Sequence, residues 1–481
     1  MGTDSTDSAK NFLVGRVLFP ASNDLFNRKD ILKNYGYLCR SEAFSQEELR
    51  DLQLSKLKEI TEYCRKYVPY YRELFRKISF VPQEIRSLDD IRRIPPLSRQ
   101  ELIENYRDMV DYRLHSSIPV AESSVRGPGE PIPFGRFRKH RLVRNTSSGS
   151  TGAPTLFFED GSRTALNWAY EFRWKKWYGI GPGAREARMA RLSTIFLPKS
   201  RSLQLRQILW NQMILPGTNL TDTEYAYCVE RIRAFRPLSL WGYTSALTGL
   251  ADYMKREGVD LSPGTLKLSI GWAAPLYDHE KVLLEDTFRC PATNIYSARE
   301  VGHIAAKCPA GSFHVNQENL IVESEPSENG EDGAGELLVT NLDLSPMPFL
   351  RYRMGDIGSV GSRRCGCGRS LQVLSSLIGR TGETFIAKEG RMISPNFWCR
   401  VFMSDRFAGQ IRRFQVVYTK ERNLRVLIVK GPGYSAEAEK YIKDTVGANF
   451  SPDTRLDFEY VSEIRPRVSG KYQMVVNEAK A

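Results

Sequence analysis

The regular alternation of apolar and polar positions begins in the run SQEELRDLQLSKLKEITEYCRKY, where leucine, isoleucine and tyrosine recur close to the helical period. This pattern predicts an amphipathic helix. Ser45 followed by Glu48 is typical of a capping box at its start. Pro69 is expected to end this helix and Pro95-Pro96 the next, because proline removes a backbone donor. The stretch from Gln46 to Arg113 is therefore predicted to be helices separated by prolines.

Farther along the chain, strand-like and helix-like runs alternate. LSLWGY, LKLSIGW and ATNIYS have the composition of strands, and SALTGLADYMKREG and YDHEKVLLEDTF between them have the pattern of helices. A β-α-β-α-β order predicts a mostly parallel sheet covered by helices. The runs that follow, HVNQENLIVESE, GELLVTNL and PFLRYRMGDIGSV, indicate antiparallel strands instead.

The last hundred residues form a second pattern, with FQVVYTK and NLRVLIVK as strands and SAEAEKYIKDTVGANF as a helix. The boundary between the two patterns falls near Gly379-Arg380. We therefore predict an N-terminal extension (1–45), a large domain (46–379) and a small, mobile C-terminal domain (380–481). The expected fold class is α/β, with an α+β C-terminal part.

The composition is that of an ordinary globular protein, with 41% hydrophobic, 26% charged and 11% aromatic residues in a chain of 481. Disordered chains have fewer apolar residues, and disulfide scaffolds are shorter and richer in cysteine. The sequence has no apolar run long enough for a spanning helix, and MGTDSTDSAK at the start lacks the apolar core of a secretory signal. We expect a cytoplasmic protein that makes no membrane contact.

The formal net charge is +13, and the excess is local. Six Lys and Arg residues against one Glu lie between Val125 and Arg144, and a second basic stretch runs from Arg185 to Arg206. Solvated surface and attraction of an anionic small molecule both explain these stretches. A nucleic-acid-binding protein is a third explanation, but the sequence contains no recognised nucleic-acid module.

The strongest local motif is Asn145–Thr155, NTSSGSTGAPT, which follows basic residues. Glycines let successive backbone N–H groups converge on an anion, and the hydroxyl groups add donors. The motif is not a Walker A loop, because it lacks G-x-x-x-x-G-K-[ST]. By itself such a loop is more often a linker.

Four downstream pieces change that interpretation. YSARE (296–300) lies just beyond a predicted strand, where α/β sheets place ligand-binding residues. RYRMGD (351–356) ends another strand with a carboxylate beside a glycine. Gly379-Arg380 lies at the predicted domain break, and Ser469-Gly470-Lys471 lies close to the C-terminus.

In this order, the pieces resemble the adenylate-forming (acyl/aryl-CoA synthetase) superfamily, in the phenylacetate–CoA ligase-like branch that includes capsular-polysaccharide-associated members. The resemblance extends from about Leu52 onward and includes VPYYR (68–72) and IPPLS (94–98). It implies a large domain with helix-covered sheets and a small C-terminal domain that rotates between two half-reactions.

The resemblance also implies a role for individual residues. The loop Ser147 to Gly152 would hold the triphosphate of ATP, Tyr296 would stack on adenine, and Asp356 would accept hydrogen bonds from the ribose. The residues that it places at the nucleotide are Ser147, Ser148, Gly149, Ser150, Thr151, Gly152, Ala273, Ala274, Pro275, Tyr296, Ser297 and Asp356.

Three further residues are implied to carry the chemistry. Glu300 would ligate Mg²⁺, which prefers oxygen ligands. Arg380 would reach the ribose or the phosphates, and Lys471 would bridge the carboxylate and the α-phosphate. The chain departs from the family pattern at Ala153, where the phosphate loop usually has lysine, and at Ser297, where glycine is common.

The acid-binding pocket is indicated only by Trp241-Gly242-Tyr243, which ends a predicted strand near the expected adenine wall. These aromatic residues would favour an aryl or planar acid. Packing of Trp241 and Tyr243 in the core is an equally good interpretation of the same residues.

Three cysteines and a histidine show a spacing that suits metal ligation. Cys308 and His314 lie close in sequence, and Cys365-Gly366-Cys367 follows farther along. Three thiolates and one imidazole make a closed tetrahedral set for structural zinc. The alternative is two buried cysteines, a surface histidine and a Cys-Gly-Cys turn, and similar Cys/His sets in members of the resembling branch favour the metal.

The expected function is therefore an ATP-dependent ligase that activates a carboxylic acid as an acyl-adenylate and releases pyrophosphate. The acyl group would pass to coenzyme A or to an amine. An adenylyltransferase-like relative that stops at the adenylate is one alternative, and a basic nucleic-acid-binding protein without catalysis is another. The sequence leaves the acid, the acceptor and the oligomeric state open.

Overall fold

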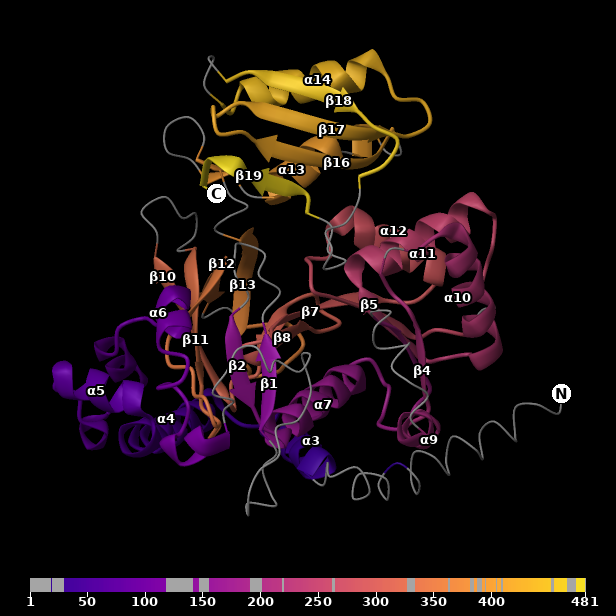
Figure 1. Cartoon of the computed structure of the whole chain (residues 1–481). Helices are drawn as coiled ribbons and strands as arrows, with labels where there is room; N and C mark the ends of the chain where they lie inside the picture. Colours follow the sequence, from indigo (N-terminus) through magenta and orange to yellow (C-terminus); the bar gives the residue numbers. More distant parts are fainter. Residues whose placement is uncertain are drawn as a thin grey trace, which may run out of the picture.

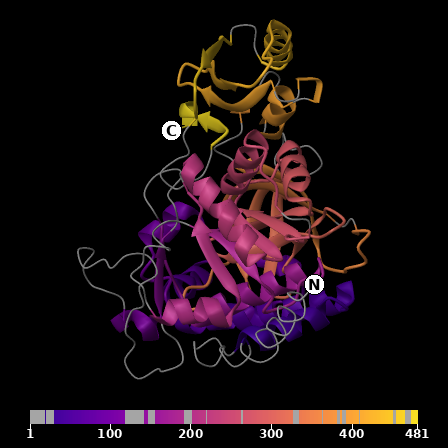
Figure 2. The same ribbon diagram turned by 90° about the vertical axis from the view of Figure 1, so that its right-hand side faces the viewer.

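The computed structural model describes residues 19, 30–117, 142–146, 155–190, 201–218, 220–261, 264–326, 334–361, 364–380, 385–386, 392–393, 395–403, 405–407, 410–450, 454–464 and 473–480. In Figure 1 the C-terminal part of the chain forms a compact unit above a larger body that contains the other elements. Figure 2 shows the same two parts from the side. No helix among these residues combines the length and the hydropathy that crossing a bilayer requires.

The N-terminal helices pack along one side of the larger body. They are α3 (Asp30–Ser41), α4 (Gln46–Tyr67), α5 (Pro69–Lys77) and α6 (Arg99–Glu104), with 3-10 turns η2 (Pro82–Glu84), η3 (Leu88–Arg93) and η4 (Tyr112–Ser117). The predicted capping box is confirmed, because the Ser45 hydroxyl accepts from the Glu48 N–H and the Glu48 carboxylate accepts from the Ser45 N–H. Pro69 occupies the first turn of α5, so the chain breaks there and restarts as a new helix.

An 11-stranded sheet organises the larger body, in the order β10-β11-β12-β13-β9-β8-β7-β6-β5-β3-β4. Its parallel half contains β3 (Glu186–Ala190), β4 (Gln212–Pro216), β5 (Ser239–Tyr243), β6 (Leu268–Trp272) and the first part of β7 (Ala292–Ala298). This half confirms the β-α-β pattern of the middle segment.

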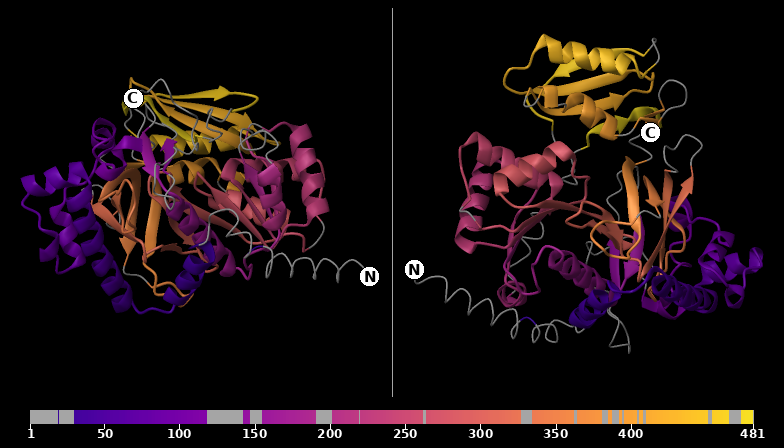
Figure 3. Two further views of the ribbon diagram at one scale, coloured as in Figure 1. Left: turned by 60° about the horizontal axis from the view of Figure 1, so that its bottom comes forward. Right: turned by 180° about the vertical axis from the view of Figure 1, so that it is seen from behind.

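Helices cover both faces of the parallel half. α10 (Asp222–Phe235), α11 (Thr244–Arg256) and α12 (Asp278–Phe288) pack on one face, where Leu240 of β5 is buried with Leu250 of α11. The opposite face carries α7 (Gly161–Lys176), whose Trp174 is buried in one cluster with Trp241 of β5. α9 (Arg201–Leu209) leads into β4. Figure 3 shows these helical layers from below and from behind.

The antiparallel half begins where β7 pairs with β8 (Gly302–Lys307). The sheet continues through β9 (Phe313–Val315), β13 (Val373–Arg380), β12 (Tyr352–Gly361), β11 (Gly335–Asn341) and β10 (Leu320–Pro326). A separate hairpin, β1 (Val143–Thr146) with β2 (Leu156–Glu159), packs its Phe157 and Phe158 into the core beneath this half. The antiparallel strands that the sequence predicts after the parallel unit are therefore present.

The C-terminal unit has its own core and its own sheet, in the order β18-β17-β16-β19. Its strands are β16 (Ile411–Tyr418), β17 (Leu424–Lys430), β18 (Leu456–Tyr460) and β19 (Val475–Asn477), next to the short pair β14 (Phe385–Ile386) and β15 (Met392–Ile393). α13 (Pro395–Phe402), α14 (Ala436–Gly447) and the turns η9 (Asp405–Phe407) and η10 (Glu478–Lys480) complete the unit. Trp398 of α13 is fully buried at its centre.

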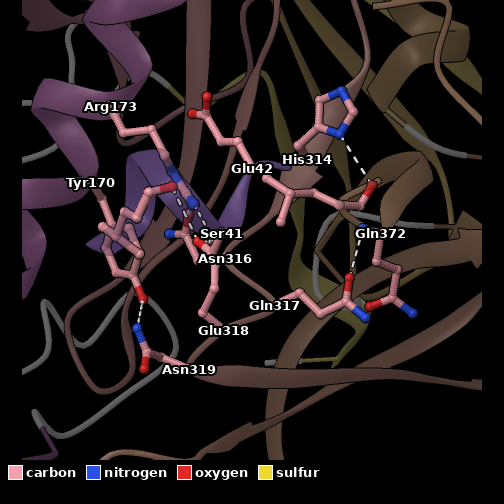
Figure 4. Close-up of polar contacts among 12 residues, drawn as sticks. Ser41, Glu42, Tyr170, Arg173, His314, Asn316, Gln317, Glu318, Asn319 and Gln372 are labelled. Carbon is pink, nitrogen blue, oxygen red and sulfur yellow. Dashed lines mark hydrogen bonds and ion pairs between the residues drawn. The ribbon is translucent and has the colours of Figure 1, made fainter. Parts of the chain in front are cut away.

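A buried ion pair joins α7 to the turn that precedes β10. The guanidinium of Arg173 contacts the carboxylate of Glu318, and both side chains are fully buried. Arg173 also donates to Asn316 Oδ1 at 2.6 Å, and Ser41 of α3 donates to the Glu318 carboxylate at 2.6 Å. Figure 4 shows these side chains converging from three separate parts of the chain.

We expect Arg173→Met to lower the free energy of unfolding by about 3–5 kcal/mol, because it leaves the Glu318 carboxylate buried without its cation. Urea unfolding followed by circular dichroism measures the change. Arg65→Met is the matched control, since Arg65 pairs with Glu62 on the surface, and about 1 kcal/mol or less should be lost there. Equal losses of unfolding free energy in the two variants would contradict the conclusion that the Arg173–Glu318 pair stabilises the fold.

The N-terminus of α12 lies against the C-terminal unit, where Tyr277 packs on the core of that unit. Glu280 accepts from the Tyr277 N–H at 3.1 Å. Burial raises the pKa of Glu280 to about 7, although the Tyr277 N–H and Arg413 of β16 act in the opposite direction. The carboxyl group is therefore half protonated near neutral pH in the folded protein.

This pKa predicts a pH dependence of stability that Glu280→Gln removes. The folded pKa of Glu280 exceeds its ordinary value, so the folded state binds this proton more tightly and its contribution to stability is lost as pH rises through 7. Relative to Glu280→Gln, the wild-type protein should lose about 2–3 kcal/mol of unfolding free energy between pH 5 and pH 8. Denaturant unfolding at several pH values tests this, and a constant difference between the two proteins would refute it.

Candidate active site

Two residues from strands that are far apart in the sequence contact each other within the sheet. The Tyr296 hydroxyl of β7 donates to Asp356 Oδ2 of β12 at 2.8 Å, and Tyr296 is 7% exposed. The backbone of Asp356 lies opposite that of Arg380 on β13. The structure thus brings together an aromatic ring and an acceptor carboxylate that the sequence analysis placed at adenine and ribose.

Backbone irregularities adjust both strands here. The register of β7 on β8 shifts between Tyr296 and Ser297, which is a bulge of the kind that re-aims side chains near functional sites. On β12, Gly355 has φ of +67°, a conformation that glycine adopts without steric cost. Asp356 follows directly after this glycine.

The turn that carries Glu300 is tied to the segments on either side of the predicted phosphate loop, Ser147 to Gly152. The Arg299 guanidinium donates to the Thr146 carbonyl at 2.8 Å, and Arg163 of α7 donates to the Glu300 carbonyl at 3.2 Å. Thr146 ends β1 and directly precedes Ser147, the first of the predicted phosphate-loop residues. Glu300 is therefore held in the part of the molecule from which that loop departs.

Several predicted residues lie outside the described residues. These are the phosphate-loop residues Ser147, Ser148, Gly149, Ser150, Thr151 and Gly152, the neighbouring Ala153, and Lys471. What is described is the frame of the loop, because β1 and β2 pair antiparallel with Thr146 opposite Leu156. Arg99 of α6 also donates to the buried Thr155 hydroxyl at 2.9 Å.

The predicted adenine wall, Ala273-Ala274-Pro275, follows β6 and is held by two side chains that sequence reasoning missed. Asn294 donates to the Ala274 carbonyl at 3.1 Å and to the Gly271 carbonyl at 2.9 Å. The Thr244 hydroxyl also donates to the Ala274 carbonyl at 3.1 Å. Ala273 has φ of +68°, which is strained for a residue with a Cβ and needs such support.

The three residues of the predicted acid pocket have different surroundings. Trp241 is 3% exposed and packs toward α7, with the Arg188 guanidinium 4.7 Å from its ring centroid. A Cβ on Gly242 would lie 3.0 Å from Leu247 Cδ2. Tyr243 instead ends β5 and stacks on Trp272 at the end of β6, with ring centroids 4.6 Å apart. The sequence analysis did not single out Trp272.

Arg188 belongs to a buried charge cluster beneath this region. Its guanidinium contacts the carboxylates of Glu186 and Glu171, and Glu186 also pairs with Lys175. Burial opposes ionisation of Glu171, but Arg188 and His303 outweigh it and lower the pKa of Glu171 to about 2. The cluster is thus a fixed set of charges that binds α7 to β3.

The four predicted metal ligands converge near the far end of the β12–β13 hairpin. One potential ligand atom from each of Cys308, His314, Cys365 and Cys367 lies within 4.8 Å of the other three. His314 Nδ1 lies 3.2 Å from the Leu371 carbonyl, so this nitrogen carries the proton. Nε2 is then left as a lone-pair donor, and it lies 3.2 Å from Cys367 Sγ. The chemistry of the set suits zinc.

The sequence is similar to those of several known proteins. Residues 385–478 match the family model of the CapK C-terminal domain. Protein CapK of Staphylococcus aureus is 20% identical over 90% of each chain. The phenylacetate-coenzyme A ligase of Thermus thermophilus is 25% identical over 73% of this chain and 75% of its own.

The fold is also that of a solved ligase. A 2-hydroxyisobutyryl-CoA ligase in the postadenylation state, in complex with R3-HIB-AMP, superposes with a TM-score of 0.70 at 18% identity over 92% of each chain. The same ligase in the thioesterification state gives 0.56 over 91% of each chain. The predicted fold class, with sheets and helices as in adenylate-forming CoA ligases, is confirmed.

Proposed function

We propose that the chain is a member of the phenylacetate–CoA ligase-like adenylate-forming family, in the branch that includes CapK, and that it is an ATP-dependent acid–CoA ligase. In the first half-reaction, a carboxylate oxygen attacks the α-phosphorus of ATP, and pyrophosphate leaves. In the second, a thiol attacks the acyl carbon, and AMP leaves. The observation that carries this proposal is the contact between Tyr296 of β7 and Asp356 of β12, in a fold of this class.

Asp356 is suited to a ribose because a carboxylate accepts several hydrogen bonds, so the contact with Tyr296 does not saturate it. That contact in turn fixes the phenol ring, which offers a flat apolar face for adenine. The supported turn at Ala273-Ala274 would form the opposite wall. Ser147 to Gly152 would hold the phosphates, and Lys471 would neutralise charge that develops at the α-phosphate.

Mg²⁺ would bind through the Glu300 carboxylate and phosphate oxygens, and it would neutralise charge on the leaving pyrophosphate. The anchoring of this turn by Arg299 and Arg163 supports the assignment, because both contacts use backbone carbonyls. The carboxylate therefore need not hold the turn in place.

For the acid substrate, we propose an aryl acid. Tyr243 and Trp272 stack at the ends of adjacent strands, beside the turn that would wall the adenine. A planar ring can extend such a stack. Coenzyme A is proposed as the acceptor because the names of several curated relatives specify coenzyme A ligases.

Rotation of the C-terminal unit between the half-reactions is also proposed. The whole chain resembles the 2-hydroxyisobutyryl-CoA ligase more closely in its postadenylation state than in its thioesterification state. The junction would lie near Gly379, which has φ of +141° and would place a Cβ only 3.0 Å from the Pro395 ring. A residue with a side chain would strain this junction in the present arrangement.

The ligase activity is tested by measuring ATP-dependent pyrophosphate release over a panel of aryl and aliphatic acids, followed by thioester formation with coenzyme A. Lys471→Ala should reduce pyrophosphate release by about 10²–10³, the scale of one preorganised charge contact. Acid-independent release, or release unaffected by Lys471→Ala, would refute the proposed chemistry.

We expect Asp356→Asn to lower kcat/KM for ATP by about 10–100-fold, because it removes a charged acceptor from the ribose. Tyr296→Phe should have a smaller effect, about tenfold, since it removes only the hydroxyl that orients the carboxylate. Tyr227→Phe is the matched control and should leave kcat/KM for ATP unchanged, because Tyr227 is exposed on α10. If ATP kinetics were normal in Asp356→Asn, the nucleotide would bind elsewhere.

The Cys/His cluster is proposed to hold one structural zinc ion. Purified protein should contain about one zinc per chain, and Cys365→Ser should lower both zinc content and thermal stability, because metal binding adds to folding free energy. Cys228→Ser is the control, since Cys228 is buried in a different core cluster. This variant should contain as much zinc as the wild-type protein. Elemental analysis that finds no zinc in freshly prepared protein would exclude the site.

A further inference from the structure

A cavity of about 820 Å³ lies at the opposite end of the β12–β13 hairpin from Asp356. Its walls come from α4, η3, β10 and the segment around residues 364–373. Val360 and Val373 line it at the end of the hairpin, whereas Asp356 pairs with Arg380 at the other end. The cavity is therefore separate from the proposed nucleotide site, and its volume is in the range of small-molecule pockets.

The cavity combines apolar surface with positive charge. Its apolar lining includes Leu54, Leu88, Ile91, Val322, Val360 and Val373. Of the acidic lining residues, Glu323 pairs with Arg351 at 3.0 Å, and Asp89 lies 3.6 Å from Arg92. Among the described residues, no ion pair is found for Arg50, Arg364 or Arg369, which also line the cavity. Asp51 is the remaining acidic group, so a positive excess is left.

Arg369 has a buried donor group for which an anion could act as the acceptor. Its guanidinium lies over the Trp177 ring, 4.6 Å from the centroid, and its Nε is buried without a hydrogen-bond acceptor among the described residues. A buried donor without an acceptor is costly, and a charged donor more so. An anion in the cavity would supply the acceptor.

We infer that this cavity binds an organic anion that has an apolar body and one acidic head group. The head group pairs with Arg364 and Arg369 at the rim, and the apolar body packs on the aliphatic lining. The inference does not depend on the proposed ligase activity.

Polar contacts connect the wall of the cavity to the Cys/His cluster. The N–H of Gln372 donates to Gln317 Oε1 at 3.0 Å, and Gln317 donates to Gln53 of α4 at 3.1 Å. The preceding Leu371 provides the carbonyl that faces His314 Nδ1, and Figure 4 shows His314, Gln317 and Gln372 near one another. A bound anion would thus stabilise the segment that carries Cys365 and Cys367.

The test is isothermal titration of the full-length protein with decanoate, and with decanol as the uncharged comparison. Decanoate should bind saturably at a site at which Arg364→Gln and Arg369→Gln each weaken binding by about tenfold, the scale of a charge-assisted hydrogen bond. Leu88→Trp, which fills the cavity, should abolish binding there. Arg425→Gln is the matched control, because Arg425 is an exposed arginine of β17.

Arg364 is exposed, so its substitution tests the inference even if Leu88→Trp or Arg369→Gln disturbs folding. The inference is overturned if decanoate does not bind, if decanol binds as tightly, or if Arg364→Gln and Arg425→Gln bind decanoate with equal affinity. Pyrophosphate release measured on the same variants keeps the two proposals separate, because these substitutions should leave it unchanged.

Discussion

The ion pair between Arg173 and Glu318 is the contact on which the larger body depends most. It joins the helix that follows the β1–β2 hairpin to the turn between β9 and β10, and Ser41 extends it to the N-terminal helices. Breaking such a pair costs far more than its net attraction, because the remaining charge has no water to solvate it. One end of α7 is therefore fixed against the sheet, while its first turn lies beside the segment that carries Glu300.

Features with a local cause were predictable from the sequence. The capping box at Ser45 and the β-α-β rhythm follow from short-range patterns, and the spacing of Cys365 and Cys367 limits them to one turn. Long-range contacts were not predictable in this way. The Tyr296–Asp356 hydrogen bond and the Arg173–Glu318 pair join residues far apart in sequence, and only the strand order brings them together.

Two local details also escaped the sequence analysis. Ala273 adopts a left-handed conformation that alanine disfavours, and it does so because Thr244 and Asn294 hold the following carbonyl. Trp272 was not singled out because its stacking on Tyr243 depends on the register of β5 and β6. Trp241 is buried toward α7, as the core-packing interpretation expects, whereas a place for Tyr243 in an acid pocket stays a prediction.

The pairing of β7 has a consequence for the order in which the site can assemble as the chain is made. β7 pairs with β6 along its first residues and with β8 along its last, so it is the junction between the parallel and antiparallel halves. Tyr296 belongs to this junction, but its partner Asp356 is synthesised much later, on β12. A nascent chain that ends before β12 lacks this pair. The hydrogen bond that fixes the Tyr296 ring is therefore available only to chains in which the antiparallel half has emerged and folded.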